Sequence, residues 1–306
     1  MRALAGLAAA LLLAGCAALG PGAGADPWPA GVPPSARIAG VPFFPQQEYQ
    51  CGPAALATTL AYSGVEVTPQ ALVPQVYTPA LHGSLQLDLI GAARRNGRMP
   101  FRIAPSEAAL LQELAGGNPV LVLQDVGRFA VEWHYAVAVG YDREADVLVL
   151  RSGPERALRM RLEDFDRSWA KGGRWGLVTL APGRIPASAD EREYLTQVAA
   201  TEPVRPALAQ AAYRASLERW PGSLGALMGL GNLAYAAGDL EQAAGYFRDA
   251  THAHPDSGDA FNNLAQTEFR LGHEAQAREA IATALSLGGP HVAIYRKTRE
   301  EMDGAR

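Results

Sequence analysis

The chain has 306 residues, of which 48% are hydrophobic and 19% are charged, and its formal net charge is −4 at pH 7. This length can hold one large domain or two modest ones, and the composition is that of an ordinary globular protein. A slightly negative sequence without a Lys/Arg cluster offers no electrostatic footprint for a nucleic acid, so no nucleic-acid partner is expected.

The first segment, residues 1–16, is an export signal by its pattern. Arg2 is followed by an uninterrupted apolar run that ends in LAGC at Cys16, and the run is too short for a permanent membrane helix. Small residues before a cysteine resemble the lipobox of bacterial lipoproteins, which implies that Cys16 is lipidated and anchors the protein to a membrane. Ala17 in the next position implies the outer membrane of a Gram-negative-type cell envelope, on the periplasmic side. The alternative is an ordinary cleaved signal in which Cys16 is incidental.

The cysteine count makes Cys51 conspicuous. The chain has two cysteines, and exported proteins normally pair their thiols. If Cys16 carries lipid, Cys51 has no partner. A free thiol in an oxidising compartment is a liability unless it is buried or used.

After a tether rich in Ala, Gly and Pro at residues 17–37, helix signals precede strand signals. Helices first and an antiparallel meander afterwards indicate an α+β domain, which we place at residues 38–183. The predicted helices are 51–64, 67–76, 83–97 and 106–117, and the predicted strands are 119–124, 132–142, 146–153 and 174–183.

The C-terminal part repeats with a period of 34 residues, and this period resembles the tetratricopeptide repeat. We predict an all-α repeat domain at 205–290, with a linking helix in 184–204 before it and a C-terminal helix or tail at 291–306. Such repeats form a curved surface that binds peptides or proteins, so a protein partner is expected there; the alternative is that they brace the neighbouring domain. The equivalent pairs are Pro221 and Pro255, Leu230 and Leu264, Gly238 and Gly272, Ala243 and Ala277, and Ala250 and Ala284.

Cys51 stands at the start of a predicted helix, with Pro53 in its first turn. A helix N-terminus and a nearby imidazolium lower the pKa of a thiol from its usual value of about 8.5, so we expect a lowered pKa for Cys51. The alternative is a small buried hydrophobe. His134 is the candidate imidazole, because it begins a strand and shares a face with the small side chains of Ala136 and Ala138.

The blocks "QxxxxCGPAAL" around Cys51 and "HYAVAVGYD" from His134 resemble the papain-like double-glycine peptidases, which trim bacteriocin leader peptides. The resemblance covers about residues 38–183 and implies a papain-like fold. It also implies Cys51 as nucleophile, His134 as general base and then acid, and an upstream glutamine as oxyanion donor. Gln46 is the best match for that glutamine, Gln47 is second and Gln50 is weaker.

The residue that orients His134 departs from the family, which has Asp or Asn there. A hairpin turning near residues 143–144 places Ser152-Gly153 opposite His134, and a Ser152 hydroxyl can accept a hydrogen bond from the imidazole but brings no charge. Asp142 should point away at the far end of the hairpin. The orienting residue is therefore Ser152, or it comes from elsewhere (Glu155 or Asp125 through a loop), or it is missing.

The sequence therefore predicts an exported, lipid-anchored cysteine peptidase with Cys51, His134, Ser152 and Gln46 in its site, and repeats that recruit substrate or partner. The alternative is a weak or inactive peptidase-like scaffold that holds peptides, and acyl transfer would use the same thiol and base. No cofactor or metal is expected, since His252 and His254 point to different sides of a helix and no Gly-rich phosphate loop is present.

Overall fold

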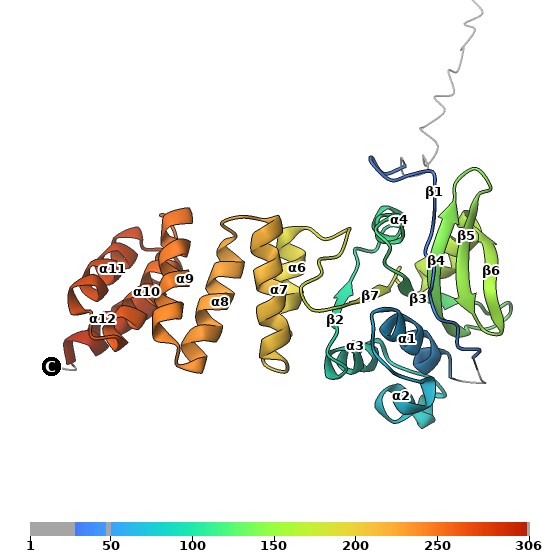
Figure 1. The fold of residues 1–306 in the computed structure, drawn as a ribbon, viewed down its shortest axis with the longest axis horizontal. Helices are drawn as coiled ribbons and strands as arrows, with labels where there is room; N and C mark the ends of the chain where they lie inside the picture. The colour runs from blue at the N-terminus through green and yellow to red at the C-terminus, as the bar shows by residue number, and fades with distance from the viewer. Residues whose placement is uncertain (1–27, 47–49, 305–306) are drawn as a thin grey trace, which may run out of the picture.

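The computed structural model describes residues 28–46 and 50–304. A sheet-containing domain is followed by a row of helices that extends away from it to one side (Figure 1). Cys16 and Gln47, which the sequence singles out, lie outside the described residues, as do the predicted signal and the first part of the tether.

The domain is built on one sheet in which every strand pair is antiparallel. Most of the strands follow the first four α-helices along the chain, in agreement with the predicted α+β class. The sequence patterns missed the first, second and sixth strands. The order is β2 (Met99–Arg102), β7 (Gly176–Leu180), β3 (Val120–Asp125), β4 (Trp133–Asp142), β5 (Val147–Ser152) and β6 (Glu155–Arg161), with β1 (Ser35–Arg37) paired to β4.

The helices of this domain cover the sheet and bury its apolar strands. α1 is buried along most of its length, including Leu56 and Leu60, and it contacts β3, β4 and β7. α5, which the sequence patterns missed, contacts β3, β5 and β6. The helices are α1 (Cys51–Tyr62), α2 (Pro69–Val76), the 3₁₀ turn η1 (Pro79–Leu81), α3 (Gln86–Arg95), α4 (Glu107–Ala115) and α5 (Leu162–Lys171).

The described end of the predicted tether, residues 28–37, is part of the fold, which corrects the expectation of a flexible linker there. β1 pairs with β4, and the Trp28 ring packs edge-on against Tyr141 at 5.5 Å between centroids. The backbone of β1 comes so close to Gly140 that an added Cβ would lie 2.6 Å from the carbonyl oxygen of Ala36. A Pro-rich segment without alternating hydrophobicity gave no sign of this pairing.

The C-terminal helices stack as antiparallel pairs, as the 34-residue period predicts. Aromatic side chains of one helix fill the space left by glycines of a neighbouring helix: Tyr213 lies over Gly229, and Phe247 lies over Gly231. A side chain at either glycine would collide with the ring. The helices are α6 (Glu191–Ala199), α7 (Pro206–Arg219), α8 (Leu224–Ala237), α9 (Leu240–Ala253), α10 (Gly258–Arg270), α11 (Glu274–Leu287) and α12 (Val292–Gly304).

The two parts are joined by specific contacts through α6. The Gln197 side chain accepts from the N–H of Arg102 at 2.7 Å and donates to its carbonyl at 3.0 Å, so it extends the pairing of β2. Tyr194 is buried between Phe101 of the sheet and Trp220 of the repeats, with ring centroids 6.0 Å apart in each case. No helix in the described part of the chain is both long and apolar enough to cross a bilayer.

Candidate active site

Cys51 is the first residue of α1 and its side chain is half-buried. The next residue must be glycine for steric reasons. A Cβ added to Gly52 would lie 2.6 Å from the Cβ of Ser84, which belongs to the segment before α3. Gly52 therefore lets that segment close over the start of α1.

Cys51 opens onto a cavity of about 1030 Å³ whose lining also includes His134 and Gln46. Two segments far apart in the sequence complete the walls: residues 81–86, before and into α3, and residues 131–135, at the start of β4. The structure thus brings three of the predicted site residues to one cavity. The fourth, Ser152, contacts His134 directly.

His134 Nε2 lies 3.0 Å from Ser152 Oγ. A hydrogen bond from Nε2 to this hydroxyl leaves Nδ1 of the imidazole for the thiol. The register differs slightly from the expected hairpin, because a bulge between Ala138 and Gly140 shifts the pairing so that Val137 lies opposite Arg151. Ser152 reaches His134 despite this shift. Asp142 points to the far end of the hairpin, where its carboxylate accepts from the N–H of Ala145 at 3.1 Å.

Gln46 is held by the backbone of the residues that follow His134 and Ser152. Its side-chain nitrogen donates to the carbonyl of Tyr135 at 3.1 Å, and its side-chain oxygen accepts from the N–H of Gly153 at 3.0 Å. One of the two amide hydrogens therefore remains for a ligand. Gln50 forms the N-cap position of α1.

The protonation states differ from the expectation. Burial raises the pKa of the Cys51 thiol, and this outweighs the lowering by the backbone N–H groups of Tyr135, Gly52 and Cys51 itself. Burial also lowers the pKa of His134, with partial opposition from the nearby charge of Glu132. The prediction of a lowered thiol pKa is therefore wrong: at neutral pH the site rests as a thiol and a neutral imidazole.

Asp125, which the sequence offers as a distant partner for His134, has a different position. One of its oxygens accepts from the N–H groups of Gly127 and Glu132, at 3.0 and 2.9 Å, and the other accepts from Lys171 at 2.9 Å. The N–H of Glu132, the Lys171 ammonium and the N–H of Gly127 hold the pKa of Asp125 at about 2. Asp125 thus fastens the loop that leads into His134.

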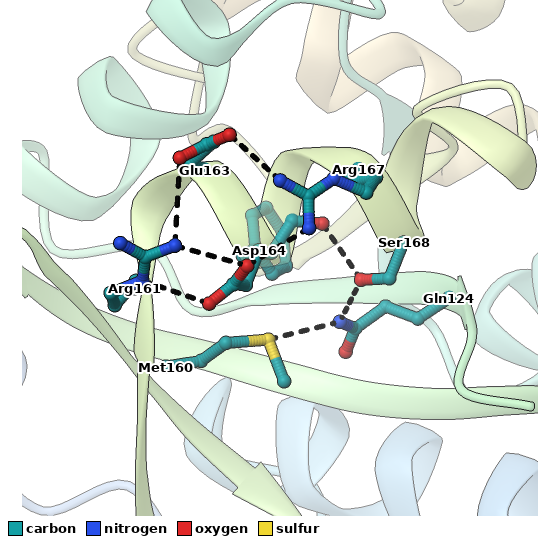
Figure 2. Close-up of polar contacts among 8 residues, drawn as sticks. Gln124, Met160, Arg161, Glu163, Asp164, Arg167 and Ser168 are labelled. Atoms are coloured by element: carbon teal, nitrogen blue, oxygen red, sulfur yellow. Dashed lines mark hydrogen bonds and ion pairs between the residues drawn. The ribbon is translucent and has the colours of Figure 1, made fainter. Parts of the chain in front are cut away.

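β3, which pairs with the strand that carries His134, is joined to α5 by the side chains of Gln124 and Ser168 (Figure 2). Gln124 lies directly opposite His134 in the β3–β4 ladder, and its side-chain nitrogen donates to Ser168 Oγ at 2.7 Å. The first turn of α5 is held by exposed ion pairs of Arg161 and Arg167 with Glu163 and Asp164. Each exposed pair contributes little by itself, at about 0–1 kcal/mol.

Two residues of the site were missed by the sequence analysis. Glu132 lines the cavity and is the carboxylate that acts on the pKa of His134. Its position two residues before a strand histidine places it on the same face, and that was the available signal. His82 also lines the cavity, although the sequence shows only a polar loop there. In the described residues, no group of three or more His, Cys, Asp or Glu side chains could hold a metal ion.

Two parts of the chain match known protein families. Residues 38–175 match the Peptidase_C39 like family. Residues 205–258 and 230–290 match the tetratricopeptide repeat. The chain is a C39-like peptidase domain fused to tetratricopeptide repeats. This confirms the resemblances expected from the two sequence blocks and from the 34-residue period.

Solved structures similar to the C39-like domain include a C39-like protein from Bacillus anthracis, 16% identical, with 48% of this chain and 97% of that chain covered at a TM-score of 0.41. The peptidase domain of Streptococcus ComA, a bifunctional ABC transporter, is 21% identical over 46% of this chain and 98% of that chain, with a TM-score of 0.39. A double glycine motif protease from an AMS/PCAT transporter, solved in complex with the leader peptide, is 21% identical over 47% of this chain and 93% of that chain, with a TM-score of 0.36. No curated protein matches the chain.

Proposed function

We propose that the C39-like domain is a cysteine peptidase in which Cys51 is the nucleophile and His134 the general base. The observation that carries the proposal is the shared cavity: Cys51 and His134 both line it, and His134 is held at Nε2 by Ser152. Such a thiol and imidazole are the two groups that acyl transfer from a peptide requires.

The reaction begins from neutral groups. The Cys51 thiol transfers its proton to Nδ1 of His134 as its sulfur attacks the substrate carbonyl carbon. The second amide hydrogen of Gln46 and the N–H of Cys51, which has no partner within the helix at its first turn, stabilise the oxyanion. The imidazolium then protonates the leaving amine, and a thioester on Cys51 remains. Water, deprotonated by His134, hydrolyses this thioester and restores the thiol.

Ser152 serves as the orienting residue in this proposal. The N–H at Nε2 of His134 donates to the Ser152 hydroxyl, which keeps the lone pair of Nδ1 available for the thiol proton. Ser152 brings no negative charge, so in the described part of the chain the imidazolium is supported by the charge of Glu132, which partly opposes the lowering of the His134 pKa by burial. We therefore expect a peptidase of modest turnover.

A second function has two observations in its favour. Burial holds Cys51 as a thiol, and a Ser stands where the family has Asp or Asn. Both features suit a domain that binds peptides without cutting them.

For the rest of the chain we propose a lipid anchor at Cys16, attachment to the periplasmic face of an outer membrane, and recruitment of a protein partner or substrate by the repeats. The support is the LAGC tetrapeptide after an apolar run and the tetratricopeptide match. Lipidation would be seen as the mass of an acylated Cys16 at the mature N-terminus. An N-terminus without lipid would contradict it.

The peptidase proposal is tested by incubating a peptide library with the full chain and mapping new termini by mass spectrometry. Cys51→Ala is expected to lower the cleavage rate on the order of 10⁴-fold or more. His134→Ala should have a similar effect, whereas His252→Ala, the same change at an exposed position in the repeats, should leave cleavage within a few-fold. Cleavage that survives Cys51→Ala would contradict the proposal. Binding without cleavage by the unmodified chain would favour the peptide-holding function.

A further inference from the structure

Exposed apolar side chains are concentrated around the cavity. Ten large hydrophobic side chains are exposed in the described residues, and seven of them lie in two short segments, 81–87 and 126–133. These are the segments that supply walls of the cavity. The seven side chains are Leu81, Leu85, Leu87, Val126, Phe129, Val131 and Trp133.

Four of these side chains line the cavity that holds Cys51 and His134. Leu81 and Leu85 are 58% and 47% exposed, and Val131 and Trp133 are 65% and 51% exposed. Apolar surface gathered in one place and left in water marks a binding site more often than chance exposure does.

The two segments are fixed in place, so the apolar side chains are positioned before a ligand arrives. Asp125 ties the 126–132 loop through the N–H groups of Gly127 and Glu132. The other segment is held at Ser84, whose carbonyl accepts from the Tyr135 hydroxyl at 3.1 Å. Such preorganisation reduces the entropy lost on binding.

Backbone, as well as side chains, is accessible in this cavity. Gly83, Gly153 and Gly172 belong to the lining, and glycine lets the main chain of a ligand come close. The charged side chains that line it, Glu132 and Lys171, are of opposite sign, and Lys171 is already paired with Asp125. An apolar lining with accessible backbone and little net charge fits a polypeptide better than an anionic lipid.

We propose that this cleft selects polypeptide segments that carry bulky aliphatic or aromatic side chains beside the bond to be cut, rather than segments with small residues there. The proposal rests on the proposed peptidase function and names its substrate class. Leu81, Leu85, Val131 and Trp133 are the specificity-determining side chains. Each bulky ligand side chain that they bury should strengthen binding by about 10- to 100-fold.

The test uses the full chain carrying Cys51→Ala, so that peptides bind without being cut. Two labelled peptides differ only at adjacent positions, Leu-Phe in one and Ser-Ser in the other, and binding is followed by fluorescence anisotropy. The Leu-Phe peptide should bind at least 10-fold more tightly. Leu85→Ser and Val131→Ser should remove most of this difference.

Matched controls are available in the same two segments. Leu87 and Phe129 are 79% and 102% exposed and are not among the residues that line the cavity, so Leu87→Ser and Phe129→Ser should leave the difference unchanged. Equal binding of the two peptides would overturn the proposal. An equal effect of control and cavity variants, with competition by phosphatidylglycerol vesicles, would overturn it in favour of a lipid surface.

Cleavage by the unmodified chain is measured separately, which distinguishes the two proposals. Discrimination by the Cys51→Ala chain without any cleavage by the unmodified chain would sink the peptidase function and leave the apolar selectivity standing. Cleavage at the same rate whether the peptide carries bulky or small residues would overturn the apolar selectivity and leave the peptidase function standing.

Discussion

At the scale of single residues, the site is defined by a thiol and an imidazole whose pKa values are pushed apart by burial. The pKa of Cys51 is raised and that of His134 is lowered, so proton transfer between them is uphill in the free protein. In the proposed reaction, a bound substrate that displaces water and brings its carbonyl to the Gln46 amide changes this balance, because the developing oxyanion gains hydrogen bonds. We therefore propose that the substrate activates the pair.

The first prediction concerns the pH dependence of Cys51 alkylation by iodoacetamide. A raised pKa means that the thiolate forms only as the pH rises through a value above the usual one, so the rate should increase continuously through the alkaline range, without a plateau in acid. The measurement is the alkylation rate against pH, with the labelled residue located by mass spectrometry. A thiolate plateau that begins well below neutral pH and disappears in His134→Ala would show a preformed ion pair.

The second prediction concerns Ser152, whose hydroxyl lies 3.0 Å from His134 Nε2. Ser152→Ala removes one neutral hydrogen bond, worth about 1 kcal/mol, and should lower kcat roughly 5-fold. Ser152→Asp places a carboxylate beside the imidazolium and should raise the pKa of His134 by about 1–3 units. Because His134 must be neutral to accept the thiol proton, the acid limb of the kcat/KM profile should move to higher pH. An unmoved acid limb would show that Ser152 does not orient His134.

Much of the site could be predicted at this scale from sequence, because each predicted residue belongs to a local pattern. Cys51 is the first residue of an apolar helix, and His134 lies at the start of a strand. The hairpin that joins His134 to Ser152 predicts the pairing of the two strands to within one residue. The pKa of Cys51 could not be predicted, because it depends on the burial of the thiol in the folded chain, which the local pattern around Cys51 does not show.

At the scale of elements, the loop between β3 and β4 carries Val131 and Glu132 to the cavity, next to Trp133 at the start of β4, and is held by the Asp125 carboxylate. Lys171, at the end of α5, holds the same carboxylate. The wall of the cavity therefore depends on the docking of α5 against β3. On the α1 side of the cavity, the absence of a side chain at Gly52 allows Ser84 and its segment to pack against the start of α1.

The third prediction is that Asp125→Asn makes the loop between β3 and β4, which lines the cavity, less firmly held. The amide keeps one acceptor oxygen but loses the charge that pairs with Lys171, so KM for bulky apolar substrates should rise more than kcat falls. The pKa of about 2 in the fold lies below the usual value of about 3.9, so Asp125 contributes stability above about pH 4 that is lost as the pH falls toward 2. Asp125→Asn should remove that part of the acid destabilisation. Unchanged KM and an unchanged acid titration of unfolding would contradict this role.

The fourth prediction concerns Gly52→Ala. The new methyl group would overlap the Ser84 side chain, and overpacking of this kind costs typically 1–3 kcal/mol. Thermal unfolding should show that loss, and the displaced Ser84 segment should weaken the discrimination between bulky and small peptides. Gly245→Ala is the control, because an added Cβ there meets nothing within 4 Å and should lower neither quantity.

Elements that form long apolar runs could be predicted, and those that are short or exposed were missed. The strands that were found, β3, β4, β5 and β7, each contain a run of buried residues, and they and the first four α-helices were placed to within a few residues. β1 and β2 have three and four residues, which is too short for a pattern. β6 is mostly exposed, and its alternating Leu158 and Met160 were a usable signal that the sequence analysis overlooked.

At the scale of the whole molecule, the C39-like domain and the repeats are joined by a buried carboxylate as well as by α6. Glu113 is fully buried and accepts from the side chains of Asn118 and Ser188 and from the N–H groups of Ala187 and Ser188, at 2.6–3.2 Å. The segment before α6 is therefore fastened to α4. The repeats (Figure 1) therefore follow a segment before α6, which we call the fixed base, that is held against the C39-like domain.

The fifth prediction is that Glu113→Ala frees this base. The change leaves several buried donors unpaired, and each unpaired donor costs about 1–3 kcal/mol. Limited proteolysis should then cut between residues 181 and 190 and release the repeats, and the melting temperature should fall. Glu66→Ala, at an exposed position, is the control. Resistance of Glu113→Ala to cleavage there would contradict a fastened junction.

In the proposed reaction, Cys51 forms a thioester with the acyl part of a peptide. The full chain is quenched in acid during reaction with an activated peptide ester, and its intact mass is measured. We expect an acyl adduct located at Cys51, retained in His252→Ala and greatly reduced in His134→Ala. A chain that binds the peptide but carries no adduct, or an adduct that persists in Cys51→Ala, would contradict the proposed reaction.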